Sequence, residues 1–154
     1  MEWAALVTWV VTAGFGFYML STWVRAGGAR QTAGTASNFP PPVVFTHFLL
    51  AAGGLVVWII YLAADKDALA WVAFVDLVVV AGIGDVLVLR WLRDRRKGSA
   101  PSTRAASVPG DTSRPGAATT LAEQQIPSGV VAAHGVFAVA TVVLVLLVAL
   151  GVGS

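Results

Sequence analysis

Four long runs of apolar residues divide the chain, and polar segments separate them. Each run is long enough to cross about 30 Å of hydrocarbon at 1.5 Å per residue. Stretches such as VVLVLLVAL near the C-terminus lack the alternation of a membrane β-strand, so we expect helices. The pattern predicts an all-α membrane protein, a single up-down bundle over residues 1–154 with transmembrane helices near 2–24, 42–63, 68–90 and 129–151.

The composition indicates that lipid is the main solvent of this chain. Hydrophobic residues make up 57% of the 154 positions and charged residues 12%, with a mean hydropathy of +0.79. A soluble domain normally carries about 25% charged residues. The absence of cysteine excludes disulfides and thiolate metal sites. We expect a multi-pass protein of a bacterial-type cytoplasmic (inner) membrane, with the lipid bilayer as its partner.

Basic residues are distributed unevenly between the two sides of the predicted bundle. Lys66 alone lies between the second and third runs. The other nine follow the first or third run: Arg25, Arg30, Arg90, Arg93, Arg95, Arg96, Lys97, Arg104 and Arg114. The positive-inside rule then predicts cytoplasmic loops after the first and third helices and two extracytoplasmic termini. This topology accounts for the net charge of +2, so we expect no nucleic-acid partner.

Residues 94–128 are rich in Ser, Thr, Pro, Gly and Arg and contain almost no large apolar residue. Such a segment cannot bury enough surface to fold alone. We therefore predict a flexible cytoplasmic linker over 94–128, with its basic start against anionic lipid headgroups.

The two halves of the chain resemble each other at constant spacings. Residues 3–25 and 71–93, 68 positions apart, share ten identities in 23 positions, including two glycines, a Trp and a terminal Arg. A spacing of 87 aligns Pro40 with Pro127 and His47 with His134. We predict a tandem repeat of a two-helix unit, with a pseudo-two-fold axis along the membrane normal.

His47 and His134 are the only histidines, and each lies seven residues after the aligned proline. Both are therefore about 10 Å into their helices at 1.5 Å per residue. Ionisable side chains at membrane depth are rare and are functional hypotheses by default. The second and fourth helices face each other across an up-down bundle, so two neutral imidazoles can supply both axial ligands of one haem iron. Zinc or copper is less favoured, because such sites usually have three or four protein ligands.

A flat macrocycle also needs room between the helices. Glycines recur at equivalent positions of the two helices without histidine: Gly14, Gly16, Gly82 and Gly84. Gly16 and Gly84 each precede a terminal Arg by nine residues, about 13 Å, which is near the level of the histidines. We expect the four glycines to line the edge of a cofactor.

Glycines on helices one and three with histidines on helices two and four resemble the haem-bearing bundle of the respiratory diheme cytochrome b. The resemblance is one of arrangement, without a long shared motif. In that family each histidine helix carries two ligands, and two haems are stacked across the membrane. With His47 and His134 alone, the resemblance implies a single haem b on the cytoplasmic side. The chain also resembles small four-helix bacterial membrane proteins of unassigned function.

A structural role for the same residues is an open alternative. A helix histidine can bond a carbonyl or a hydroxyl such as that of Thr46, and membrane helices use glycine for close packing. Asp76 and Asp85 replace Thr8 and Phe17 of the first copy. They can form a proton path or structural contacts, and Asp85 can orient an imidazole through its second nitrogen.

The leading hypothesis is a small b-type cytochrome-like membrane protein that transfers electrons to or from a membrane redox partner and is not an enzyme on its own. One alternative is a non-catalytic subunit or scaffold that stabilises a larger complex through its helix faces. A further alternative is a proton-coupled carrier, which at four helices would need a homodimer.

Overall fold

The computed structural model describes residues 1–30, 37–64, 66–98 and 121–152, and within these ranges it contains helices and no β-strand. Four of the helices are long and apolar enough to cross a membrane, which confirms the predicted all-α class with four long apolar helices. In chain order the elements are α1 (Glu2–Arg25), α2 (Pro41–Ala64), α3 (Asp67–Gly98), the short 3₁₀ helix η1 (Ala122–Gln125) and α4 (Ser128–Ala149).

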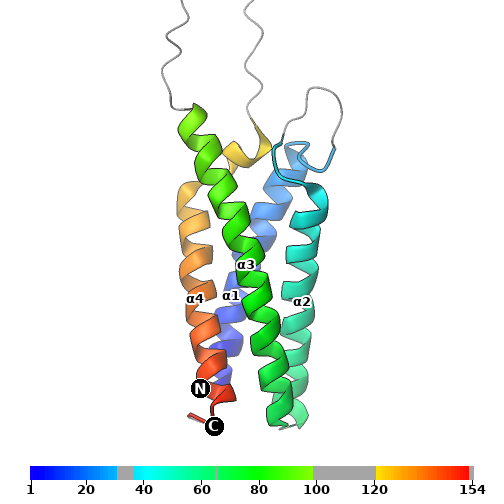
Figure 1. Cartoon of the computed structure of the whole chain (residues 1–154), viewed down its shortest axis with the longest axis vertical. Coiled ribbons are helices and arrows are strands. Elements are labelled where there is room, and N and C mark those ends of the chain that lie inside the picture. The colour runs from blue at the N-terminus through cyan, green and yellow to red at the C-terminus, as the bar shows by residue number, and fades with distance from the viewer. Residues whose placement is uncertain (31–36, 65, 99–120, 153–154) are drawn as a thin grey trace, which may run out of the picture.

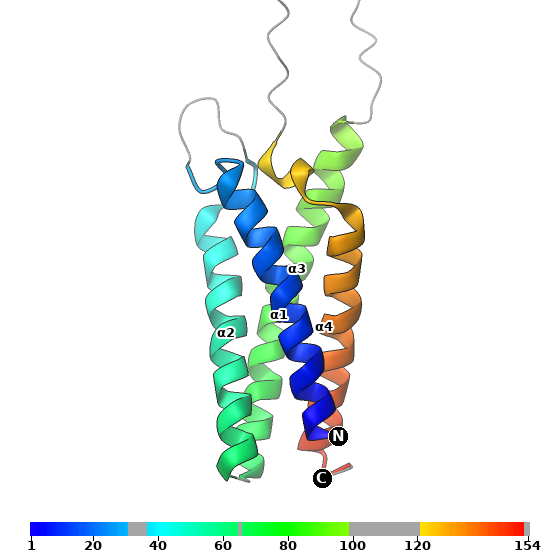
Figure 2. The same cartoon turned by 180° about the vertical axis from the view of Figure 1, so that it is seen from behind.

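The four long helices form an up-down bundle whose two termini lie at the same end (Figure 1). α1 packs most extensively against α4, and α2 against α3. Seen from both sides, the start of α2, the end of α1 and η1 lie together at the other end, beyond which α3 projects (Figures 1 and 2). We call these the terminal end and the loop end. Within the described residues, no Cα atom of α1 lies within 8 Å of α3, or of α2 within 8 Å of α4, so these pairs are diagonal.

The core is concentrated on the bundle axis, while most outward side chains are apolar and exposed, as lipid requires. One core cluster occupies the terminal half. Its buried members are Ala5, Trp9, Trp58, Tyr61, Ala70, Ala73, Leu77, Val145 and Val148. The Trp9 and Trp58 rings are 6.4 Å apart, and those of Trp58 and Tyr61 are 4.8 Å apart. The Tyr61 hydroxyl donates to Glu2 Oε1 at 2.7 Å, which closes the cluster at the terminal end.

The second core cluster closes the loop end. Trp23 and Trp91 are both buried, and each donates its indole N–H to the segment that precedes a histidine helix. Trp23 Nε1 donates to Ser37 Oγ at 2.8 Å, and Trp91 Nε1 donates to the Glu123 carbonyl at 3.1 Å. Glu123 is fully buried, and its Oε1 accepts from the Asn38 backbone N–H at 2.7 Å. Glu123 therefore joins the chain before α4 to both α3 and the chain before α2.

This packing corrects the ends of the predicted linker over 94–128. α3 continues to Gly98, because a helix leaving the hydrocarbon can continue with charged side chains. At the other end, residues 121–127 pack on the bundle through Ala122 and Ile126. The remainder of the linker, 99–120, lies outside the described residues.

The end of α1 depends on two glycines. Gly27 has φ of +85°, in the left-handed region that glycine adopts without strain. A β-carbon on Gly28 would collide with the Trp23 indole ring. The chain thus turns directly over Trp23, which its bond to Ser37 holds in place.

Buried residues recur at the same two spacings as the identical residues of the sequence. At the spacing of 68, buried residues pair Ala5 with Ala73, Trp9 with Leu77 and Trp23 with Trp91. At the spacing of 87, they pair Phe39 with Ile126, Trp58 with Val145 and Tyr61 with Val148.

Candidate functional site

His47 on α2 and His134 on α4 face each other across the bundle. Their ring centroids are 6.4 Å apart, and the ring planes are inclined by 59°. Both side chains are partly buried. The structure thus brings together the two histidines that the sequence singled out, although their helices are diagonal and their backbones are well separated.

Each imidazole is held by a backbone carbonyl of an adjacent helix. His47 Nδ1 lies 3.1 Å from the Val80 carbonyl oxygen on α3, and His134 Nδ1 lies 3.0 Å from that of Thr12 on α1. A carbonyl can only accept, so these contacts favour the tautomer with the proton on Nδ1. The lone pair then lies on Nε2 of both rings, which is the arrangement that a metal-bound histidine usually has.

Glycines on the same two helices make room for the rings. A β-carbon on Gly16 would lie 3.2 Å from His134 Cε1, and one on Gly84 would lie 3.2 Å from His47 Cε1. Each glycine is one helical turn after the carbonyl that holds the ring, since Gly16 follows Thr12 by four residues and Gly84 follows Val80 by four. Carbonyl and glycine together form one cradle on each helix.

The two cradles occupy equivalent positions of the chain. Thr12 and Gly16 are each 68 residues before Val80 and Gly84, and His47 is 87 residues before His134. In both halves the ring thus lies against a carbonyl and a glycine at equivalent positions of the chain.

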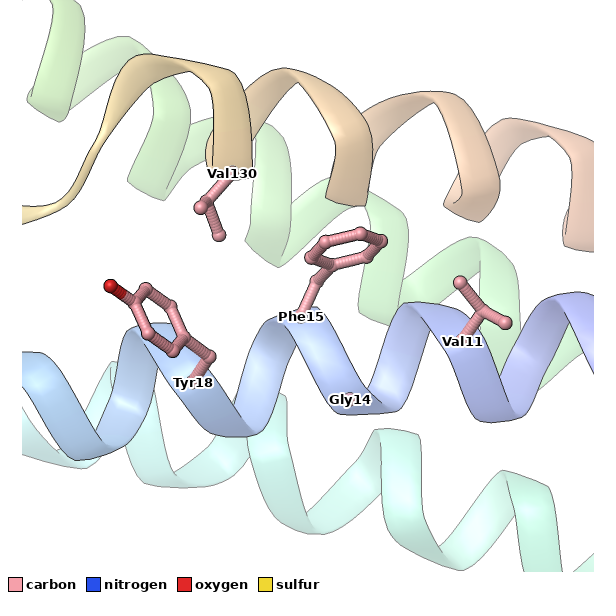
Figure 3. Close-up of a pocket in the computed structure, with 5 residues that line it drawn as sticks. All are labelled: Val11, Gly14, Phe15, Tyr18 and Val130. Carbon is pink, nitrogen blue, oxygen red and sulfur yellow. The ribbon is translucent and has the colours of Figure 1, made fainter.

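Gly14 and Gly82 do not join this site. A β-carbon on either would have no atom within 4 Å. Gly14 instead lines a shallow apolar groove between α1 and α4, together with Val11, Phe15, Tyr18 and Val130 (Figure 3). Of the four glycines, Gly16 and Gly84 therefore lie against the rings and Gly14 and Gly82 do not, and the expectation that they line a cofactor stays a prediction.

The two aspartates within the apolar part of α3 have different surroundings. Asp85 is exposed on α3, and the Nδ1 partners are carbonyls, so the expected role of Asp85 in orienting an imidazole is not found. Asp76 points toward α2, where its carboxyl fills the space above Gly54. Its Oδ2 is buried and has no hydrogen-bond partner among the residues that the structure describes.

The donor set is small. No group of three or more His, Cys, Asp or Glu side chains that could hold a metal ion occurs in the described ranges. Bonds from an imidazole nitrogen to a metal are about 2.0–2.1 Å, and a ring centre lies about 1 Å behind its nitrogen, so two imidazoles on opposite sides of one ion have centroids about 6 Å apart. The observed 6.4 Å fits this spacing.

Sequence reasoning identified the imidazoles but not the backbone groups that hold them. The sequence does contain a signal for these carbonyl groups, because Thr12 and Val80 lie one turn before Gly16 and Gly84 on the same helix face. The role of Glu123 carried no comparable signal, because a single Glu in a polar segment resembles a solvated residue.

No protein-family model matches the chain, and no curated protein and no solved structure is detectably similar to it. The inference of function therefore depends on the geometry of the histidine site.

Proposed function

We propose that the protein is a small membrane cytochrome that binds one haem b between His47 and His134. The proposal depends on one observation: the two imidazole rings lie 6.4 Å apart, and Nδ1 of each ring lies within hydrogen-bond distance of a backbone carbonyl, so that Nε2 remains available to bind a metal ion. Two protein ligands are too few for an ordinary zinc site, whereas a porphyrin supplies the other four itself.

Each residue at this site would have a different role in binding haem. His47 and His134 would be the axial ligands, and the Val80 and Thr12 carbonyls fix the orientation of the rings. Gly16 and Gly84 let the backbones of α1 and α3 approach the imidazole rings. The bound haem would carry one electron at a time. The apolar helices exclude water and, with the ligand type, set the reduction potential.

The position of the site follows from the proposed topology. We infer that the loop end, with its basic residues on α1 and α3, faces the cytoplasm of a bacterial-type cell, and that both termini lie outside. The histidines are nearer to the loop end, so the haem would exchange electrons with a partner on or near the cytoplasmic side. We also infer that the chain arose by duplication of a helical hairpin, which produced two half-sites that share one iron.

An absorbance spectrum of the purified protein tests this proposal. We expect a Soret band when the protein is made with sufficient haem, and bands typical of two imidazole ligands after reduction. His47→Ala and His134→Ala should each abolish the band without preventing membrane insertion. Thr46→Ala is the matched control, because Thr46 is exposed beside His47 and makes no hydrogen bond in the described residues. A wild-type protein that stays colourless when haem is supplied would refute the proposal.

A second candidate, a non-catalytic subunit of a larger membrane complex, is favoured by two features of the outer surface. Asp85 is exposed on a membrane-spanning helix, although ionisable residues in such helices usually face the protein interior. The groove above Gly14 is likewise open to a neighbouring helix (Figure 3). Co-purification of a fixed partner that survives both histidine substitutions but is lost in Asp85→Leu would favour this function.

A further inference from the structure

The Asp76 carboxyl is placed inside the bundle without a bonding partner. It lies against Gly54 on α2. Because glycine has no side chain, the carboxyl occupies the space where a β-carbon would be. A β-carbon on Gly54 would also lie 3.0 Å from Trp9 Cζ2 on α1, so the carboxyl lies among three helices. Oδ2 is buried and unbonded. Leaving a buried acceptor without a hydrogen bond is unfavourable, and more so for a charged group, so this arrangement requires a reason.

At the equivalent place in the other half of the chain, the polar side chains have hydrogen-bond partners. Thr8 is 68 residues before Asp76, and Thr141 is 87 residues after Gly54. Thr8 Oγ1 donates to the Ala5 carbonyl at 3.0 Å, and Thr141 Oγ1 donates to that of Phe137 at 2.8 Å. Two threonines bonded to their own helices thus correspond to one carboxyl that is bonded to nothing. The helix pair α1 and α4 thus has no ionisable group at this place.

Asp76 is close to the histidine site along two helices. On α3 it is one turn before Val80, whose carbonyl holds His47. On α2, Gly54 follows His47 by seven residues, which is about 10 Å at 1.5 Å per residue. Two charges separated by about this axial distance interact appreciably at the effective dielectric constant of about 20 that applies in proteins.

We propose that Asp76 takes up one proton when the histidine site accepts one electron, so that electron transfer through this protein is coupled to proton uptake. This inference rests on the proposed haem. With a haem bound, one electron from a one-electron donor would reduce its iron, and one proton from the surrounding buffered solution would convert the Asp76 carboxylate to the carboxylic acid. The positive charge lost at the iron is replaced by the proton, so the net charge inside the bundle is unchanged.

Few other ionisable groups lie near the level of Asp76 on the helices around it, and Tyr18 and Arg25 of α1 are toward the loop end. On α2 these are His47 toward the loop end and Tyr61 toward the terminal end, and on α1 Glu2, which accepts from Tyr61. α4 carries only His134, and the neighbouring ionisable residues of α3 itself are Asp67 and the exposed Asp85. Asp94 and Glu123 also have a buried oxygen without a hydrogen-bond partner in the described residues, but both lie at the loop end, outside the membrane-crossing part of the bundle that contains Asp76.

Redox titration at several pH values, with the full-length protein in lipid nanodiscs, tests the inference. With one proton bound per electron, the midpoint potential of the wild type should fall by up to about 59 mV per pH unit, the one-electron equivalent of a tenfold change. Reduction with dithionite in weak buffer should also take up about one proton per haem, read by a pH indicator. Asp76→Asn should remove both effects and keep the Soret band.

Two further variants make the result decisive. Asp85→Asn, which alters an exposed carboxyl on the same helix, should keep the slope and the proton uptake. Asp76→Thr introduces the residue that the other half has at this place, and it should behave like Asp76→Asn. A haem-binding wild type without slope, or a slope retained in both Asp76 variants, overturns this inference and leaves the cytochrome proposal intact. Loss of haem from both variants also overturns it, because Asp76 would then be structural. A wild type without a Soret band overturns the proposed function itself.

Discussion

Gly16 on α1 is in direct contact with His134 on α4. A β-carbon at Gly16 would lie 3.2 Å from Cε1 of the imidazole, and Gly84 has the same relationship to His47. Such a distance is tighter than most contacts of real β-carbons, so the ring would have to move by a few tenths of an ångström. Each ring is also held at Nδ1, which limits that movement.

Gly16→Ala and Gly84→Ala should therefore weaken the site, whereas Gly14→Ala and Gly82→Ala should not. The first pair crowds an imidazole, and overpacking costs about 1–3 kcal/mol. The second pair adds a methyl group in open space and improves helix propensity. Thermal denaturation and haem retention of the four variants measure the difference. Equal behaviour of the two pairs would contradict the cradle geometry.

These glycines also show what the sequence could predict. The repeated AGxG motif located both cradles, yet it could not by itself show which glycine faces the ring. Residues two apart on a helix point in nearly opposite directions, so Gly14 and Gly16 cannot both face His134. Only a second residue on the same face, such as Thr12, decides between them, and its contribution is a backbone carbonyl that any side chain would allow.

The helix limits were predictable to the extent that hydropathy decides them. The predicted end of the third helix near residue 90 marks the end of the hydrocarbon, whereas α3 itself continues to Gly98. Packing of residues 121–127 was not predictable, because it depends on Trp91 and Asn38, which are distant in sequence and offer one indole N–H and one backbone N–H to Glu123.

Gly54→Ala should destabilise the protein by about 1–3 kcal/mol, because the new methyl group would overlap the Asp76 carboxyl and crowd Trp9. In an Asp76→Ala background the same change should cost much less, since the carboxyl is gone. Thermal denaturation of the two single variants and the double variant gives the coupling energy directly. Additive effects would show that the carboxyl does not lie over Gly54. Gly53→Ala, which has open space, is the control.

Glu123→Ala should loosen the loop end by about 1–3 kcal/mol, because the Asn38 backbone N–H would lose its bond to a buried carboxylate. Glu123→Gln should retain most of the stability, since its amide oxygen can accept the same bond while the bond from Trp91 goes to the backbone. Thermal denaturation compares the two. A Gln variant as unstable as the Ala variant would indicate that the negative charge, and not the hydrogen bond, stabilises this end.

Gly28→Ala should be among the most damaging small changes at the end of α1. The added carbon would collide with the indole of Trp23, which is fully buried and bonded to Ser37. The ring cannot turn away without breaking that bond, so we expect a loss of at least about 2 kcal/mol. Gly129→Ala, at the start of α4 with no neighbour within 4 Å, should leave the denaturation temperature nearly unchanged.

The proposed topology can be tested cleanly because the chain has no cysteine. Val152→Cys places a single exposed thiol at the terminal end, and Asn38→Cys places one at the loop end, where only backbone atoms of Asn38 make the observed bonds. If both termini are extracytoplasmic, a membrane-impermeant maleimide should label Val152→Cys in intact cells and Asn38→Cys only after lysis. The reverse pattern would place the basic end of α3 outside, against the positive-inside rule, and would move the histidine site to the outer half of the membrane. The haem would then have to exchange electrons with a partner outside the cell membrane, so this measurement decides on which side to search for that partner.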